Sequence, residues 1–89
     1  MPKNDVLPSP ETDFSKVEEE VTELIQEATA LRSEASLSQG QVAAKLGMSS
    51  HSHIAAIETG RVVPRLNTFL RILSLYDHTI KIVRKDSEK

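Results

Sequence analysis

The chain has 89 residues, which is enough for one small domain and too few for two. It contains no cysteine, which excludes disulfides, thiol catalysis and cysteine-ligated metal sites. Apolar residues make up 38% of the chain and aromatic residues only 3%, a composition that favours a helical core over an all-β domain. No apolar run is long enough to span a membrane and no signal peptide opens the sequence, so we expect a cytoplasmic protein.

The formal net charge of −2 conceals a separation of charge along the chain. Residues 1–37 hold nine acidic and three basic residues, whereas residues 38–89 hold four acidic and eight basic residues. The two parts therefore carry net charges of −6 and +4. This asymmetry indicates that one part meets an anionic polymer and the other a cationic partner.

Residues 1–13 contain three prolines and little to bury, which is typical of a flexible arm. A helix is then expected from Ser15 to Glu34, because apolar residues recur at helical spacing and Ser15 with Glu18 fits a capping box. Five glutamates occupy the other positions of its first turns: Glu18, Glu19, Glu20, Glu23 and Glu27. A cluster of this kind is more often a solvated face than a binding site.

Two short helices separated by a glycine are expected next. The first begins with a capping box formed by Ser38 and Gln41, and Gly47 fits the left-handed residue that ends it. The second is expected over Ser50–Glu58, with Ser49 or Ser50 as its cap. This arrangement is the helix-turn-helix pattern.

Pro64 interrupts the chain before a fourth helix, in which apolar residues from Leu66 to Leu75 share one face. The pattern then alternates, which predicts a short strand over residues 79–84. An isolated strand is not stable in water, so we expect it to pair with the same strand of a second copy in a two-fold dimer. The residues expected to join the two copies are Ile80, Ile82 and Val83.

The central residues also occur in the order of a known family. They are Leu37, Ser38, Gln39, Val42, Ala43, Leu46, Gly47, Met48, Ser49, Ile54, Ile57, Glu58, Thr59, Gly60, Arg61, Pro64, Leu66, Thr68, Phe69 and Leu70. In this order they closely resemble the Cro/phage-repressor (XRE-like) helix-turn-helix family over about residues 24–76. The resemblance implies a mainly α, lambda-repressor-like bundle of four to five helices. The DNA-binding domain would occupy residues 14–77, with residues 78–89 forming the dimerisation strand and a charged tail.

In this family the second helix of the motif lies in the major groove of double-stranded DNA. The resemblance therefore implies that Ser50, His51, Ser52 and His53 face base edges. Gln39 matches a glutamine that meets a phosphate, Arg61 matches a basic residue at the backbone, and Lys45 and Arg65 add charge. Glu58 is expected to form an internal salt link.

The sequence departs from the family pattern at the start of the second helix of the motif. Four residues separate Ser49 from Ile54, where the family has three. The extra residue either lengthens the turn or moves the cap from Ser49 to Ser50.

The ending, a helix followed by the residues 80–83, resembles the HigA and HipB antitoxins of bacterial toxin–antitoxin pairs. That resemblance implies a homodimer that represses its own operon at a palindromic operator and neutralises a small basic mRNA-cleaving toxin. Glu19, Glu20, Glu23 and Glu27 suit such a partner electrostatically. Two alternatives stay open: a stand-alone regulator such as a prophage repressor, and a protein-interaction module without DNA binding.

Other chemistry finds little support in the sequence. His51 and His53 diverge by roughly 200° at a helix start, so a metal site is not expected there. No set of nucleophile, base and orienting residue is present, and no glycine-rich phosphate loop. We therefore expect neither an enzyme nor a bound cofactor.

Overall fold

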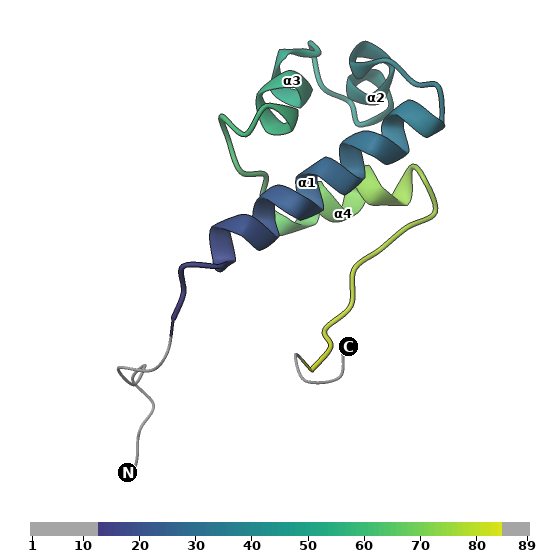
Figure 1. The fold of residues 1–89 in the computed structure, drawn as a ribbon. Helices are drawn as coiled ribbons and strands as arrows, with labels where there is room; N and C mark the ends of the chain where they lie inside the picture. Colours follow the sequence, from purple (N-terminus) through teal and green to yellow (C-terminus); the bar gives the residue numbers. More distant parts are fainter. Residues whose placement is uncertain (1–12, 85–89) are drawn as a thin grey trace.

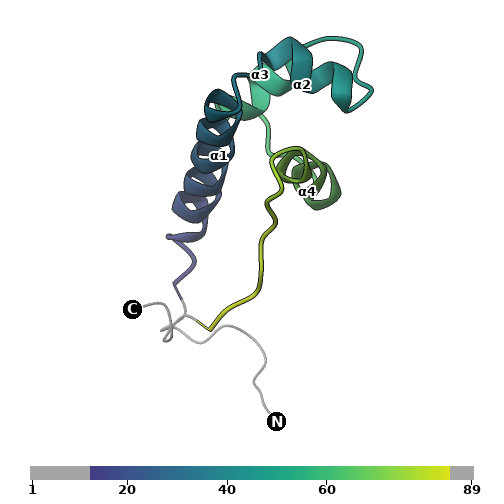
Figure 2. The ribbon, with the colours of Figure 1, turned by 90° about the vertical axis from the view of Figure 1, so that its right-hand side faces the viewer.

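The computed structural model describes residues 13–84 and contains four helices in that range. They are α1 (Val17–Glu34), α2 (Gln39–Lys45), α3 (Ser52–Glu58) and α4 (Leu66–Ser74). In Figure 1, α2 and α3 lie together above α1 and α4, and Figure 2 shows the same grouping from the side. The predicted mainly α bundle is therefore confirmed. The predicted arm, apart from Asp13, and the charged tail from residue 85 onward lie outside the described residues.

The core forms where the four helices meet. Its buried side chains come from every helix: Ile25, Ala28, Val42, Ala43, Leu46, Ile54, Ile57, Phe69, Ile72 and Leu73. The most enclosed of them is Val42, in the middle of α2. Because both short helices bury one face in this cluster, their opposite faces are held toward solvent by the core.

The local signals around α2 are confirmed. The Ser38 hydroxyl accepts a hydrogen bond from the backbone N–H of Gln41 at 3.0 Å, and the Gln41 side chain accepts one from the Ser38 N–H at 2.7 Å. Gly47 and Gly60 follow α2 and α3 with φ of +78° and +82°, the left-handed conformation that glycine adopts without a steric penalty.

The predicted start of α1 is wrong. The helix begins at Val17, and its N-cap position is Lys16, which makes no side-chain cap. The carboxylate of Asp13 accepts a hydrogen bond from the Ser15 N–H at 2.9 Å, so a local turn precedes the helix. Ser15 consequently lies outside the helix, and the expected capping box with Glu18 does not form.

The predicted start of α3 is also wrong, by two residues. Neither Ser49 nor Ser50 occupies the N-cap position, which belongs to His51. The Ser50 hydroxyl instead accepts a hydrogen bond from the Ser52 N–H at 3.3 Å and shares another with the Ser52 hydroxyl at 2.7 Å. This side-chain turn occupies the residues that the sequence pattern assigned to the first turn of the helix.

The predicted C-terminal strand is not formed within the single chain. Residues 78–84 have no regular secondary structure, and in Figure 1 they run away from the helices. A strand needs a hydrogen-bonded neighbour, and the rest of the described chain is helix, turn or loop. Ile80 lines a hollow with residues of α1 and α4 and is 37% exposed, whereas Ile82 is fully exposed, with 103% of its reference surface accessible.

Two glycines of the α2 region should respond in opposite ways to substitution by alanine. Gly47→Ala should lower the free energy of unfolding by about 1 kcal/mol, because a residue with a side chain disfavours positive φ. The added Cβ would meet no atom within 4 Å, so the loss comes from the backbone conformation and not from a clash. Gly40→Ala is the matched control, since the nearest atom to its added Cβ is the Ser38 hydroxyl at 3.8 Å. Alanine should stabilise that helical position by about 0.5 kcal/mol. Urea unfolding followed by circular dichroism measures both, and equal changes would contradict the left-handed role of Gly47.

Candidate nucleic-acid interface

The turn between α2 and α3 is fixed from two directions. The N–H of Met48 donates to the carbonyl of Ala43 at 2.9 Å, which closes the end of α2 around Gly47. Arg71 of α4 donates from Nη2 to the carbonyl of Leu46 at 2.9 Å. Met48 itself packs against the core. The angle between the two helices of the motif is therefore set by contacts with the rest of the domain.

The extra residue between Ser49 and Ile54 lengthens the turn. The first helical residue of α3 is Ser52, and the Ser50 hydrogen bonds hold the residues before it in a non-helical turn. Ile54 nevertheless remains buried in the core. The insertion is thus absorbed before the helix, and the buried face of α3 keeps its place.

The residues predicted to face bases lie together at the start of α3. Ser50, His51, Ser52 and His53 are all exposed. The two serine hydroxyls are already hydrogen-bonded to each other. The two imidazoles make no hydrogen bond to any other described residue, so His51 and His53 are the groups at this position with free donors and acceptors.

Three exposed basic side chains lie at the ends of the neighbouring helices. Lys45 ends α2, Arg61 follows α3, and Arg65 directly precedes α4. Among the described residues none of the three forms an ion pair or a side-chain hydrogen bond. From residue 35 to residue 76 the only acidic residue is Glu58, so the charge around α2 and α3 is positive once Glu58 is paired.

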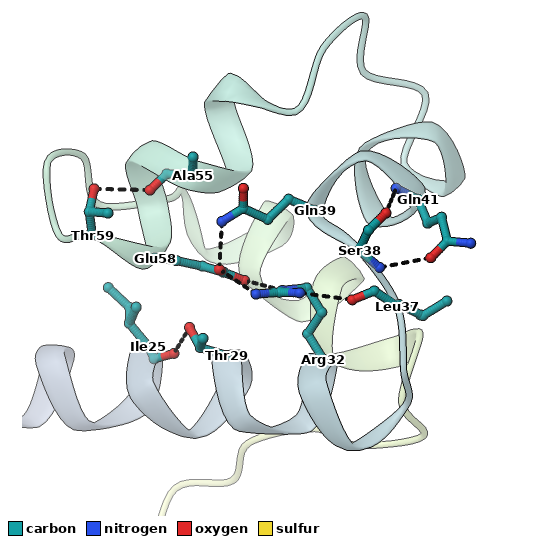
Figure 3. Close-up of polar contacts among 10 residues, drawn as sticks. All are labelled: Ile25, Thr29, Arg32, Leu37, Ser38, Gln39, Gln41, Ala55, Glu58 and Thr59. Carbon is teal, nitrogen blue, oxygen red and sulfur yellow. Dashed lines mark hydrogen bonds and ion pairs between the residues drawn. The ribbon is translucent and has the colours of Figure 1, made fainter.

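Glu58 is paired, as expected, in an internal salt bridge. Its carboxylate accepts hydrogen bonds from Arg32 Nε at 2.7 Å and Arg32 Nη2 at 3.0 Å (Figure 3). The Glu58 side chain is 13% exposed and that of Arg32 is 18% exposed. Arg32 Nη1 also donates to the carbonyl of Leu37 at 2.8 Å. The hydrogen bonds to Glu58 raise the pKa of Arg32 above its ordinary value. The pair joins the last turn of α1 to the end of α3.

Gln39, predicted to meet a phosphate, belongs to the same network. Its Nε2 donates to Glu58 Oε1 at 3.0 Å, which holds the half-buried side chain against α3 (Figure 3). An amide nitrogen carries two hydrogens, so this bond leaves one N–H of Gln39 for a second acceptor. Glu58 therefore fixes the direction of a side chain at the start of α2.

Sequence reasoning missed both arginines that organise the site. Arg32 is 26 residues from Glu58, and Arg71 is 25 residues from Leu46. No local spacing relates residues so far apart. The available signal was the scarcity of acidic residues between 35 and 76, which makes Glu58 the natural partner for a half-buried arginine.

The four glutamates predicted to meet a basic partner line two adjoining hollows that have Glu23 in common. Glu20, Glu23 and Glu27 line a hollow of about 390 Å³, together with Leu24, Ile80 and Lys81. Glu19 lines a different hollow, with Glu18, Thr22 and Glu23. Within residues 13–84 none of these glutamates forms an ion pair.

Comparison with known proteins assigns the chain to a family. A family model described as a helix-turn-helix domain matches residues 23–79, more than half of the chain. The chain belongs to this helix-turn-helix domain family. No curated protein and no solved structure gives a match.

The described residues, 13–84, show neither a metal site nor a membrane span. They contain no group of three or more histidine, aspartate or glutamate side chains arranged to hold a metal ion. None of the described helices is long and apolar enough to cross a membrane.

The Arg32–Glu58 pair should be coupled in stability. Arg32→Met leaves a half-buried carboxylate without its main partner, and Glu58→Gln leaves the guanidinium unpaired. Each should lower the free energy of unfolding by about 2 kcal/mol. The double variant should lose clearly less than the sum of the two losses, because neither charge is then left alone. Urea unfolding of all four proteins measures the coupling, and additive losses would show that the pair contributes none.

Proposed function

We propose that this helix-turn-helix domain is a cytoplasmic, sequence-specific DNA-binding regulator that acts as a homodimer and has no catalytic activity. Family membership indicates a DNA-binding regulator. The observation that carries the proposal is the helix-turn-helix unit itself, in which two exposed imidazoles without hydrogen bonds to other described residues start α3, exposed basic side chains follow α2 and α3, and Glu58 is neutralised by Arg32. A surface with donors, acceptors and unpaired positive charge suits duplex DNA.

In this proposal α3 enters the major groove. His51 and His53 donate to acceptors on base edges, and Ser50 and Ser52 exchange their mutual hydrogen bond for bonds to bases. Arg61, Lys45 and Arg65 contact phosphates, as does the remaining N–H of Gln39. Phosphate contacts fix the register of the domain on the duplex, and base contacts select the sequence.

The C-terminal segment supports the proposed dimer. Ile82 and Val83 are exposed apolar side chains on an extended chain whose backbone has no ladder partner among the described residues. Pairing with the same segment of a second copy would satisfy both needs symmetrically. A dimer would present two α3 helices to half-sites about 34 Å apart on a palindromic operator.

A second proposed role is that of an antitoxin, which represses its own operon and neutralises a small, basic, mRNA-cleaving toxin. The unpaired glutamates of α1 favour this role over a stand-alone regulator, because they offer a cationic protein an anionic surface away from α3. Co-purification with the product of the neighbouring gene tests it. Absence of a basic partner there would leave the stand-alone regulator.

Arg61→Ala should weaken binding to every DNA sequence tested and reduce the salt dependence of the binding constant by about one unit, as loss of one phosphate contact requires. Lys16→Ala is the control, since it removes the same charge at the end of α1 remote from α2 and should leave the slope unchanged. Gel shifts on the region upstream of the gene, over a series of salt concentrations, measure both. If the unmodified protein forms no specific complex at low salt, the proposal of DNA binding is wrong, and a protein-interaction module is the remaining alternative.

Ile82→Asp should convert the dimer to monomers and weaken operator binding by at least about tenfold, because the two half-sites are then bound independently. The side chain is fully exposed, so the substitution should not affect the fold of the single chain. Thr22→Asp adds the same charge at an exposed position of α1 and should preserve the dimer. Analytical ultracentrifugation distinguishes the two, and an intact Ile82→Asp dimer would remove the strand from this role.

A further inference from the structure

An apolar hollow lies between the N-terminal half of α1 and the beginning of α4. It has a volume of about 190 Å³ and is lined by Val21, Leu24, Ile25, Val63, Pro64, Leu66, Phe69 and Ile80. Two of its lining side chains are largely accessible, with Val63 at 66% and Leu66 at 64% exposure. Adjoining exposed apolar side chains of this size mark a place where another chain packs.

The apolar hollow adjoins the acidic hollow described above. Leu24 and Ile80 line both of them, so the two form one continuous surface. The glutamates of the acidic part, Glu20, Glu23 and Glu27, follow one stripe of α1 at helical spacing. The surface therefore offers an apolar recess next to a row of three carboxylates.

We propose that this surface, which we call the acid-edged groove, binds a cationic amphipathic segment of a partner protein. An apolar side chain of that segment fills the recess between Leu24 and Leu66. Lysine or arginine side chains next to it reach past Ile80 to the carboxylates of α1. The inference rests on the partner-binding role proposed above. It specifies the binding surface and the kind of segment that the partner presents.

Charge decides between a foreign segment and a second copy of this chain. The groove's own cation is Lys81, which lines the hollow with three glutamates and forms no ion pair with them. A second copy docked through the same face would bring three further carboxylates to the interface and one further lysine at this position. Like charges brought together at an interface oppose association, so a cationic partner fits the groove and a copy does not.

Peptide binding to the full-length protein tests the groove. The probe is a labelled peptide with leucines at helical i, i+3, i+4 and i+7 spacing and lysines elsewhere. One control peptide has the same composition in scrambled order, and the other has glutamate in place of lysine. Fluorescence anisotropy should show binding of the first peptide only, and chemical-shift changes should be confined to residues that line the groove.

Three variants locate the binding. Leu66→Ser should weaken peptide binding at least about tenfold by removing an apolar wall of the recess. Glu23→Gln combined with Glu27→Gln should weaken it and flatten its salt dependence. Glu18→Gln is the matched control, since Glu18 lines the other hollow of α1, and it should leave binding unchanged. Circular dichroism establishes that each variant is folded.

Three results of the peptide and ultracentrifuge experiments would overturn the inference. They are equal binding of the scrambled peptide, peptide binding that Leu66→Ser leaves unchanged, and dissociation of a dimer by Leu66→Ser in the ultracentrifuge. The last would show that the face joins two copies. None of the groove variants should change the gel shift. If the unmodified protein fails to bind DNA, that result therefore contradicts the proposed DNA binding and not the groove. A co-purified neighbour that the groove variants still bind would preserve the antitoxin role and refute the groove.

Discussion

The carboxylate of Glu58 holds the DNA-binding unit in place. It accepts hydrogen bonds from Arg32 of α1 and Gln39 of α2 while it sits at the end of α3, so one side chain ties three helices together. Both charged partners are largely removed from water, where an unpaired charge would be costly. The geometry of the motif and the pairing of this charge therefore depend on each other. The same pairing neutralises the single negative charge between residues 35 and 76, on the unit that we propose approaches phosphates.

Much of the fold could be predicted because its signals are local. The capping box at Ser38, the left-handed glycines 47 and 60 and the apolar spacing of the helices each depend on residues within a turn or two of one another. The errors at Ser15 and Ser50 have one cause. A short polar side chain that can cap a helix can also close a turn beside it, and the choice depends on packing that the local sequence does not contain. Long-range pairs such as Arg32 with Glu58 escape local reasoning altogether.

For the candidate site, the structure shows the exposure of the predicted residues, and their role stays a prediction. Its serines, histidines and basic residues are exposed around α3, but their positions depend on where the helix begins, and that moved by two residues. The strand was predicted from alternating apolar and polar residues. Such alternation indicates that a segment can form a strand, but it does not identify the neighbouring strand. In the single chain the two isoleucines of the segment differ in exposure: Ile80 lines a hollow beside α1 and α4 at 37% exposure, and Ile82 is fully exposed.

The separation of charge along the sequence becomes a separation in space. Five of the six glutamates of α1 lie between Glu18 and Glu27, whereas α2 packs at the other end of the helix, near Arg32, where Glu34 is the one remaining carboxylate (Figure 1). Charges farther apart than about 8 Å are largely screened at physiological salt, so the acidic surface would not cancel the proposed attraction between α3 and DNA at close range. At longer range and lower salt the same dipole would turn the acidic end away from a duplex and α3 toward it. A cationic partner bound at that end would weaken this orienting field, which couples partner binding to DNA association without any change in the shape of the motif.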